Sequence, residues 1–297
     1  MRVIDIQMAG GFTARILPDR GLDISTAWSH GVPIGWMSKV GEVAPLARAD
    51  GMAWIERFTG GLLTTCGPDN IGVPSVDGDE SLGLHGSWTF LRATDVHVSR
   101  ERVDGELMVD ITGTLRQTHA LGRNIEIKRL VRLLSGQSVI AVMDEITNLG
   151  SSAEPMPMLY HVNIGAPLWS AGATIEYPPE TTLIPRNSNA AANVAVASVG
   201  PEPIRNGEEY VFERVVSGGD TVPVIVRNPA LGLKLSLTWS RSSLPRFHQW
   251  IHLPVPTARP NTAPKRAAAP APLTAPAVSA EPASVVVTLV ALTRRTA

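Results

Sequence analysis

The sequence predicts an all-β fold, a large sandwich of antiparallel sheets. Hydrophobic residues alternate with polar ones over several segments, and clusters of glycine, proline, asparagine and aspartate separate these segments. Because successive side chains of a strand point to opposite faces, such alternation is typical of strands with one buried face. Amphipathic helical patterns are scarce in the chain, which favours a large sandwich of antiparallel sheets.

Three segments show the alternation most clearly. Apolar residues take every second position in "ELMVDITGTLR" (106–116), in "NIEIKRL" (124–130) and in "LKLSLTW" (233–239). Turn-forming clusters such as "GPDNIGVPSVDGDE" and "NLGSSAEP" lie between the predicted strands. The three segments are therefore predicted to be half-buried antiparallel strands.

The C-terminal part of the chain differs in composition from the rest. From Pro254 to Ser284 it holds ten alanines and eight prolines, and proline removes a backbone donor and fixes φ. We expect a poorly ordered segment at about 254–284. The following "SVVVTLVAL" (284–292) is strongly β-prone and predicts a strand that returns to the sheet. No composition shift precedes this segment, so we expect a single domain over residues 1–297.

Charge and cysteine content limit the classes of partner that we expect for the protein. The chain has 297 residues, a formal net charge of −1 and 18% charged residues, without the basic surplus of nucleic-acid-binding proteins. Its single cysteine, Cys66, cannot form an internal disulfide. No signal peptide and no run long enough to span a membrane is recognised. We expect a cytoplasmic protein with neither nucleic acid nor membrane as partner.

Several kinds of catalytic site find no support in the sequence. His248 and His252 in "FHQWIHLP" stand in a strand-like, proline-flanked context, so no metal site is expected. Glycine-rich segments lack the spacing of phosphate-binding loops, and no cofactor is expected. No G-x-S-x-G elbow is present, and Cys66 is expected to be a small buried residue.

Polar residues gather instead at glycine-rich strand ends. Imidazoles exchange protons near neutrality, and amide, guanidinium and carboxylate groups supply the hydrogen bonds that a polyhydroxylated ligand needs. These segments predict a carbohydrate site with the candidate residues Arg20, Asp23, Asp69, Asn70, His85, Trp88, His161 and Asn163.

A structural interpretation stands beside each functional one. Arg20 and Asp23 equally suit an ion pair at a turn, and "PDN" at residues 68–70 equally suits a turn cap. Each of the two histidines also suits a buried residue whose ring nitrogens are satisfied by hydrogen bonds, although a role in the site is favoured for both. The sequence alone leaves these alternatives open.

Four ordered motifs resemble a known superfamily. "PDRGLDI…GVPIGWMS", "FTGGLLTTCGPDNIGVP", "GLHGSW" and "PMPMLYHVNIGAPL" resemble the aldose 1-epimerase-like proteins of the galactose mutarotase superfamily, and within it a branch long described as a domain of unknown function. The resemblance runs from about Arg15 to about Trp250. It implies a galactose mutarotase-like β-supersandwich with a sugar in an open cleft. It also implies that His85 in "LHG" holds the sugar and that His161 in "YHVNIG" is the general acid on the ring oxygen.

The catalytic base is where the sequence departs from this resemblance. Mutarotases use a late glutamate, but the chain after "FHQWIH" reads "LPVPTARPNTAPKR", with Arg259 before Pro260 and no carboxylate before Glu281. Asp69 and Asp23 are the remaining candidates for the base. Alternatively, the protein has lost full activity, or its C-terminus is drifted or frame-altered.

The resemblance implies an isomerase that interconverts the anomers of a free sugar. Ring opening requires removal of the proton on O1 and protonation of the ring oxygen O5, that is, general acid and base catalysis. Two alternatives remain: a catalytically impaired sugar-binding relative, and another isomerase or a lyase that acts on a sugar in the same cleft.

Overall fold

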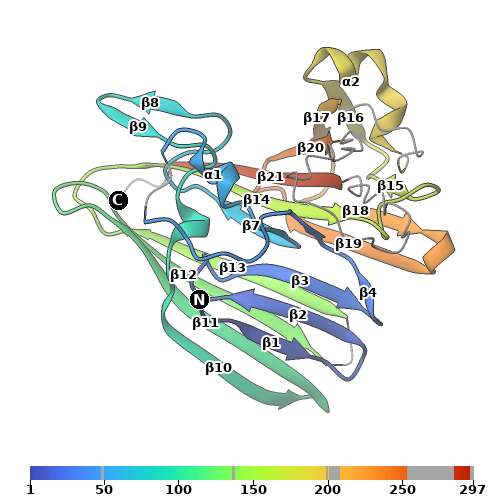
Figure 1. The fold of residues 1–297 in the computed structure, drawn as a ribbon, viewed down its shortest axis with the longest axis horizontal. Coiled ribbons are helices and arrows are strands. Elements are labelled where there is room, and N and C mark those ends of the chain that lie inside the picture. The colour runs from blue at the N-terminus through green and yellow to red at the C-terminus, as the bar shows by residue number, and fades with distance from the viewer. Residues whose placement is uncertain (48–49, 136–137, 199, 201–207, 253–283, 295–297) are drawn as a thin grey trace, which may run out of the picture.

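The structure is a computed structural model that describes residues 1–47, 50–135, 138–198, 200, 208–252 and 284–294. Strands dominate it, and two short α-helices are present in the described part of the chain (Figure 1). The predicted all-β sandwich is therefore confirmed. Apart from its last residue, the segment expected to be poorly ordered at about 254–284 lies outside the described residues, as do Arg259 and Glu281.

One large antiparallel sheet forms the first layer. Its strands are β1 (Ile4–Gln7), β2 (Phe12–Leu17), β3 (Asp23–Ser29), β4 (Val32–Pro33), β7 (Leu63–Cys66), β14 (Pro155–Gly165), β16 (Thr181–Pro185), β17 (Glu209–Val216), β20 (Arg246–His252) and β21 (Ser284–Arg294). The order across the sheet is β1-β2-β3-β7-β14-β21-β20-β17-β16, and β4 pairs with β3. Strand β14 thus lies in the middle of the sheet.

Two smaller sheets form the second layer. The four-stranded sheet has the order β10 (Thr94–Val103), β11 (Glu106–Thr118), β12 (Asn124–Leu134) and β13 (Val139–Asn148). The three-stranded sheet has the order β15 (Thr174–Glu176), β18 (Thr221–Asn228) and β19 (Leu233–Ser240). The three segments predicted from alternation correspond to β11, β12 and β19, and "SVVVTLVAL" lies in β21, so these four strand predictions are confirmed.

Short elements connect the layers. Two hairpin-like pairs are β5 (Trp36–Met37) with β6 (Gly60–Gly61) and β8 (Ser75–Asp77) with β9 (Glu80–Leu82). The helical turns are α1 (Ala53–Glu56), α2 (Ser188–Ala192), η1 (Trp88–Phe90), η2 (Val194–Ala197) and η3 (Pro229–Leu231). The segment that holds α1, β8, β9 and η1 lies over the outer face of the large sheet near β7 and β14 (Figure 1).

The hydrophobic core lies between the two layers. Its buried residues come from the large sheet and from both smaller sheets, including Ile16, Ile127 and Val224. A cavity of about 950 Å³ also lies between the layers, lined by apolar side chains of β13, β14 and β19. Burying these inward faces is the main favourable contribution to such a fold.

Candidate active site

Strand β14 divides its side chains between two environments. Met158, Tyr160 and Val162 line the cavity between the layers. His161 and Asn163 alternate with them, so they project from the opposite, outer face of the large sheet. This outer face is the location of the candidate site, and the cavity of the core is not part of it.

Two histidines from distant segments meet on the outer face. The ring centroids of His85 and His161 lie 5.6 Å apart, with the ring planes at 73°. His161 is 7% exposed, and His85 is partly buried. The structure thus brings together the two histidines that the sequence singles out. It also places Asn163 of β14 beside His161.

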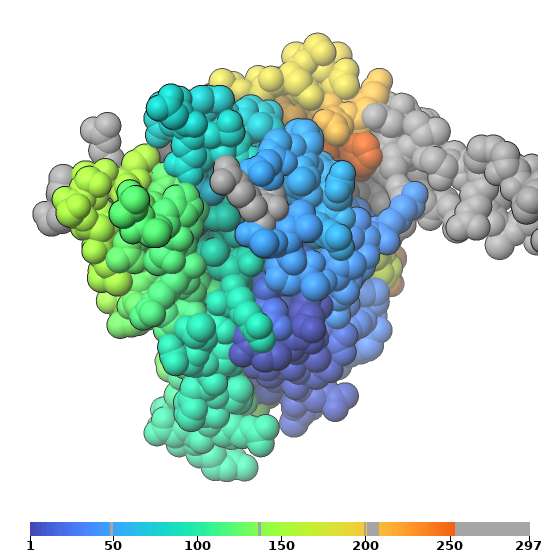
Figure 2. Space-filling view, turned by 60° about the vertical axis from the view of Figure 1, so that its left-hand side comes forward, coloured from blue at the N-terminus to red at the C-terminus, as the bar shows by residue number. Residues whose placement is uncertain are grey.

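Aromatic rings cover this histidine pair. Trp54 and Phe58 stack on each other with centroids 4.4 Å apart. The ring centroids of Trp54 and His85 lie 4.7 Å apart and those of Phe58 and His161 lie 5.4 Å apart, both in T-shaped arrangements. Figure 2 shows the light-blue α1 segment beside the cyan β8–β9 segment on one face of the molecule. The covering rings therefore come from a segment that sequence analysis did not assign to the site.

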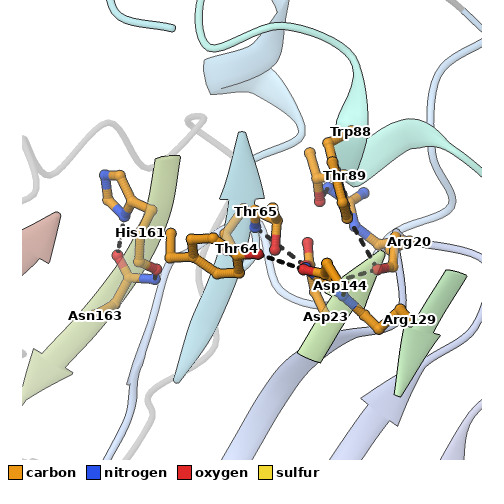
Figure 3. A network of polar contacts seen from close by, with 12 residues as sticks. Arg20, Asp23, Thr64, Thr65, Trp88, Thr89, Arg129, Asp144, His161 and Asn163 are labelled. Atoms are coloured by element: carbon orange, nitrogen blue, oxygen red, sulfur yellow. Dashed lines mark hydrogen bonds and ion pairs between the residues drawn. The ribbon is translucent and has the colours of Figure 1, made fainter. Parts of the chain in front are cut away.

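Hydrogen bonds hold each histidine through one ring nitrogen. His161 Nδ1 lies 2.7 Å from Asn163 Oδ1, and Asn163 Nδ2 donates to the carbonyl oxygens of Gly61 at 2.8 Å and His161 at 3.2 Å. The backbone N–H of Gly72 donates to His85 Nδ1 at 3.2 Å. Figure 3 shows the other nitrogen of His161 on the edge of the ring away from Asn163.

Burial keeps both imidazoles neutral near pH 7. It lowers the pKa of His85 to about 4. Burial, and next the neighbouring His85, lower the pKa of His161 to about 3, against the hydrogen bond with Asn163, which raises it. A neutral imidazole has one donor and one acceptor nitrogen, so each ring offers only one of these functions to a ligand.

The loop that carries His85 has a constrained backbone. His85 has φ of 56°, in the left-handed region that few residues other than glycine adopt. The backbone N–H and Oγ–H of Ser87 both donate to Asp69 Oδ1, at 2.9 and 3.1 Å. Residues held in such conformations gather at functional sites. Asp69 thus supports the loop of His85 through its carboxylate.

Asn70 lies next to Asp69 and also makes structural contacts. Its Nδ2 donates to the carbonyl oxygens of Val73 and Gly83, and its Oδ1 accepts from Ser75 Oγ. The amide thus ties β8 and β9 to the loop before η1. Its predicted contact with a sugar stays a prediction.

Two other candidate residues, Arg20 and Trp88, lie in the protein interior. Arg20 donates to the carbonyl oxygens of Val43 and Arg57, and its side chain is buried. Trp88 is fully buried, and its indole N–H donates to the carbonyl oxygen of Gly21. These groups are occupied by the protein itself. The contacts of Arg20 and Trp88 do not support a sugar-binding role, which stays a prediction for both residues.

Asp23 belongs to a buried network that links the layers (Figure 3). Its Oδ1 accepts from the backbone N–H of Thr65 on β7 and from Arg129 on β12, both at 3.0 Å. Arg129 also donates twice to Asp144, with both distances 2.7 Å, and Tyr160 donates to Asp144 at 2.5 Å. The network connects β3, β7, β12, β13 and β14, so it fixes the position of the strand that carries His161.

Arg129 was not recognised from the sequence, although a signal was present. In the alternating "NIEIKRLVRLL" it takes an inward position among apolar residues, and its guanidinium lies 4.7 Å from the ring centre of Trp88. A charged residue in an inward row requires buried partners. Trp54 and Phe58 gave no such signal, because no periodic pattern relates them to the histidines.

The strand register shows which residues of β17 and β20 lie on the same outer face as His161. His161 and His248 both pair with position 288 of β21, and His248 pairs with Glu213 of β17, so all three lie on the same face. Glu213 is 6% exposed and forms an ion pair with Arg186. Three interstrand spacings of about 4.8 Å separate it from His161, about 14 Å along the sheet.

The described part of the chain shows neither a metal site nor a membrane span. No group of three or more His, Cys, Asp or Glu side chains there is arranged to hold a metal ion. No helix in the same residues is long and apolar enough to cross a membrane.

Solved structures share this architecture. A candidate aldose 1-epimerase from Klebsiella pneumoniae superposes on 97% of this chain and 70% of its own, with 20% identity and a TM-score of 0.81. Slr1438 from Synechocystis sp. covers 98% of this chain and 86% of its own, with 13% identity and a TM-score of 0.59. A galactose mutarotase-like protein from Clostridium acetobutylicum covers 99% and 95%, with 14% identity and a TM-score of 0.56.

The chain thus has the fold of a candidate aldose 1-epimerase and of a galactose mutarotase-like protein, to both of which it is similar in structure. More specifically, residues 1–255 match the family described as domain of unknown function DUF4432, and the chain belongs to that family. No curated protein is significantly similar to the chain in sequence.

Proposed function

We propose that the protein is an aldose 1-epimerase that binds a free sugar and interconverts its anomers by general acid and base catalysis of ring opening. The observation that carries the proposal is the pair of neutral histidines on the outer face of the sheet, beneath stacked aromatic rings. Imidazoles exchange protons near neutrality, and aromatic rings offer apolar faces to a sugar ring. The proposal needs neither a metal nor an organic cofactor.

The experiment is a direct assay of mutarotation. Freshly dissolved α-anomers of neutral hexoses and pentoses are followed by polarimetry or by NMR exchange spectroscopy, with and without the protein. We expect accelerated equilibration of at least one sugar. A panel without any acceleration would contradict the proposed activity.

A specific observation favours one alternative, a sugar-binding relative without catalysis. Neither carboxylate considered as a base is free of protein contacts: Asp23 is bound by Arg129 and Thr65, and Asp69 is bound by Ser87. If no other group can take the proton from O1, the cleft binds a sugar and does not turn it over. Ligand-induced thermal stabilisation without faster mutarotation would identify this case.

The same proposal covers location and domain organisation. We propose one aldose 1-epimerase-like domain over residues 1–297, in the cytoplasm, with a small-molecule carbohydrate as partner. Cell fractionation tests the location, and limited proteolysis tests the domain boundary.

A further inference from the structure

The hydrogen bonds of His161 determine which of its nitrogens carries the proton. The amide nitrogen of Asn163 must face the carbonyl oxygens of Gly61 and His161, because these atoms only accept hydrogen bonds. The amide oxygen therefore faces His161 Nδ1, and two acceptors cannot form the 2.7 Å contact. His161 thus has its proton on Nδ1 and a lone pair on Nε2.

His85 is held in the opposite tautomer. Its Nδ1 accepts the backbone N–H of Gly72, so a neutral ring carries its proton on Nε2. Among the residues that the structure describes, neither Nε2 atom has a hydrogen-bond partner. The two rings therefore offer a ligand one donor, from His85, and one acceptor, from His161.

We propose that His161 is the single proton shuttle of the reaction, acting first as base on O1 and then as acid on O5, while His85 donates a hydrogen bond to the sugar. The proposal rests on the proposed function and assigns the base for which the sequence offers no clear match. It adds a first step to the role of general acid that the resemblance implies for His161.

The shuttle balances protons and electrons. His161 Nε2 takes the proton of O1, the O1 electrons form the C1=O1 double bond, and the C1–O5 bond breaks with its electron pair on O5. The imidazolium then gives the same proton from Nε2 to O5, which yields the open-chain aldehyde and a neutral His161. Because O1 and O5 are both bonded to C1, one nitrogen can serve both. Closure on the other face of the carbonyl reverses the steps.

Asn163 is the positioning residue in this scheme. In catalytic triads, a histidine Nε2 takes a proton from one atom and returns it to another, while a third group on Nδ1–H fixes the tautomer. Asn163 Oδ1 occupies that third position here. It also stabilises the transient imidazolium by accepting its Nδ1–H.

Among the residues that the structure describes, no group beside His161 would keep it protonated. No described carboxylate lies within hydrogen-bond reach of the ring. Burial raises the pKa of the Cys66 thiol on the same face, so this group is neutral as well. In the described residues, the titratable and charged side chains of the neighbouring elements include Glu42, Glu56, Arg57, Cys66, Asp69, His85, Glu213 and His248.

The first test reads the tautomers without any substrate. Long-range ¹H–¹⁵N correlation spectra of labelled protein at pH 7 distinguish Nδ1–H from Nε2–H imidazoles, and H161N and H85N assign the signals. We expect an Nδ1–H pattern for His161, an Nε2–H pattern for His85, and a mixed pattern for His161 in N163A. An Nε2–H or doubly protonated His161 in the wild type would overturn the shuttle.

The second test is the pH profile of mutarotation. A shuttle works in the unprotonated form, so kcat should be level from about pH 5 to 9 and fall only in acid, where His161 is protonated. Loss of activity on the alkaline side would mean that a protonated His161 is the acid and that another group is the base. That result overturns the shuttle and leaves the proposed function intact.

A variant tests Asp69, one of the two carboxylates considered as the base. D69N removes the charge and keeps an oxygen that accepts from Ser87, so any loss should come from displacement of the His85 loop and appear mainly as a raised KM. A loss of about 10²-fold or more in kcat with unchanged KM would make Asp69 the base and overturn the shuttle. If no sugar is turned over by the wild type, the proposed function fails, and the shuttle fails with it.

Discussion

Replacing Arg129 by methionine should destabilise the protein more than any ordinary surface change. The Arg129 side chain is 0% exposed, and its partners Asp23 and Asp144 are 5% and 2% exposed. R129M keeps an apolar chain of similar length and leaves both carboxylates buried without their cation. Breaking a buried pair by removing one partner typically costs about 3–5 kcal/mol.

The same strand provides a matched control. Arg132 also donates twice to one carboxylate, that of Asp110, at 2.7 and 2.6 Å, but its side chain is 36% exposed. Exposed pairs contribute little, because water solvates the separated charges. R132M should therefore cost much less than R129M. Equilibrium urea unfolding followed by tryptophan fluorescence at pH 7 gives both free energies of unfolding.

The difference in free energy of unfolding between R129M and R132M should also depend on pH. Burial raises the pKa of Asp23 above its usual value, and Arg129 opposes this shift. A carboxyl group whose pKa is higher in the folded than in the unfolded state makes the folded protein less stable as the pH rises. The free energy of unfolding of R129M should therefore increase as the pH falls from 7 toward 5. Equal losses for R129M and R132M, or a loss that is independent of pH, would refute the reasoning.

Three further predictions concern the site. H161N should lower kcat by about 10²–10⁴-fold with little change in KM, whereas H85N should impair both; wild-type rates in H161N would make the residue structural. Trp54→Leu uncovers His85, so the pKa of this histidine should rise from about 4 toward 6.5, as NMR titration would show. Gly86 and Gly72 both have positive φ, but a Cβ at Gly86 would lie 2.5 Å from a backbone oxygen, whereas Gly72 faces open space. Thermal unfolding should therefore show G86A to be clearly less stable than G72A. Equal midpoint temperatures would contradict the expected clash of the added Cβ at position 86.

The sequence predicts the architecture because alternation is a local property. A strand with one buried face must place apolar residues at every second position, and β11, β12 and β19 follow this rule. The same local reading marks His85 and His161 as candidates, because both are polar residues at glycine-rich strand ends, but it does not separate a catalytic role from a buried structural one. The four motifs, taken together, carry the resemblance to the galactose mutarotase superfamily, and the fold agrees with it.

Contacts between distant segments decide the rest. Asn163 is oriented by a carbonyl 102 residues away, and Arg129 meets Asp23 across 106 residues. Local periodicity cannot predict either contact, because each contact depends on which strands become neighbours and in what register. For the same reason the sequence alone left Asp23 and Arg20 open as sugar ligands, whereas the fold buries them in hydrogen bonds.

The chain by itself therefore determined an all-β sandwich, a set of motifs that resemble the galactose mutarotase superfamily, and two histidines that stand out from the core pattern. Only the tertiary structure decided that these histidines form a pair, that Trp54 and Phe58 cover them, and that their tautomers are opposite. The physical reason is that hydropathy is encoded residue by residue, while a proton's position on an imidazole is set by the partner that folding brings to the other nitrogen.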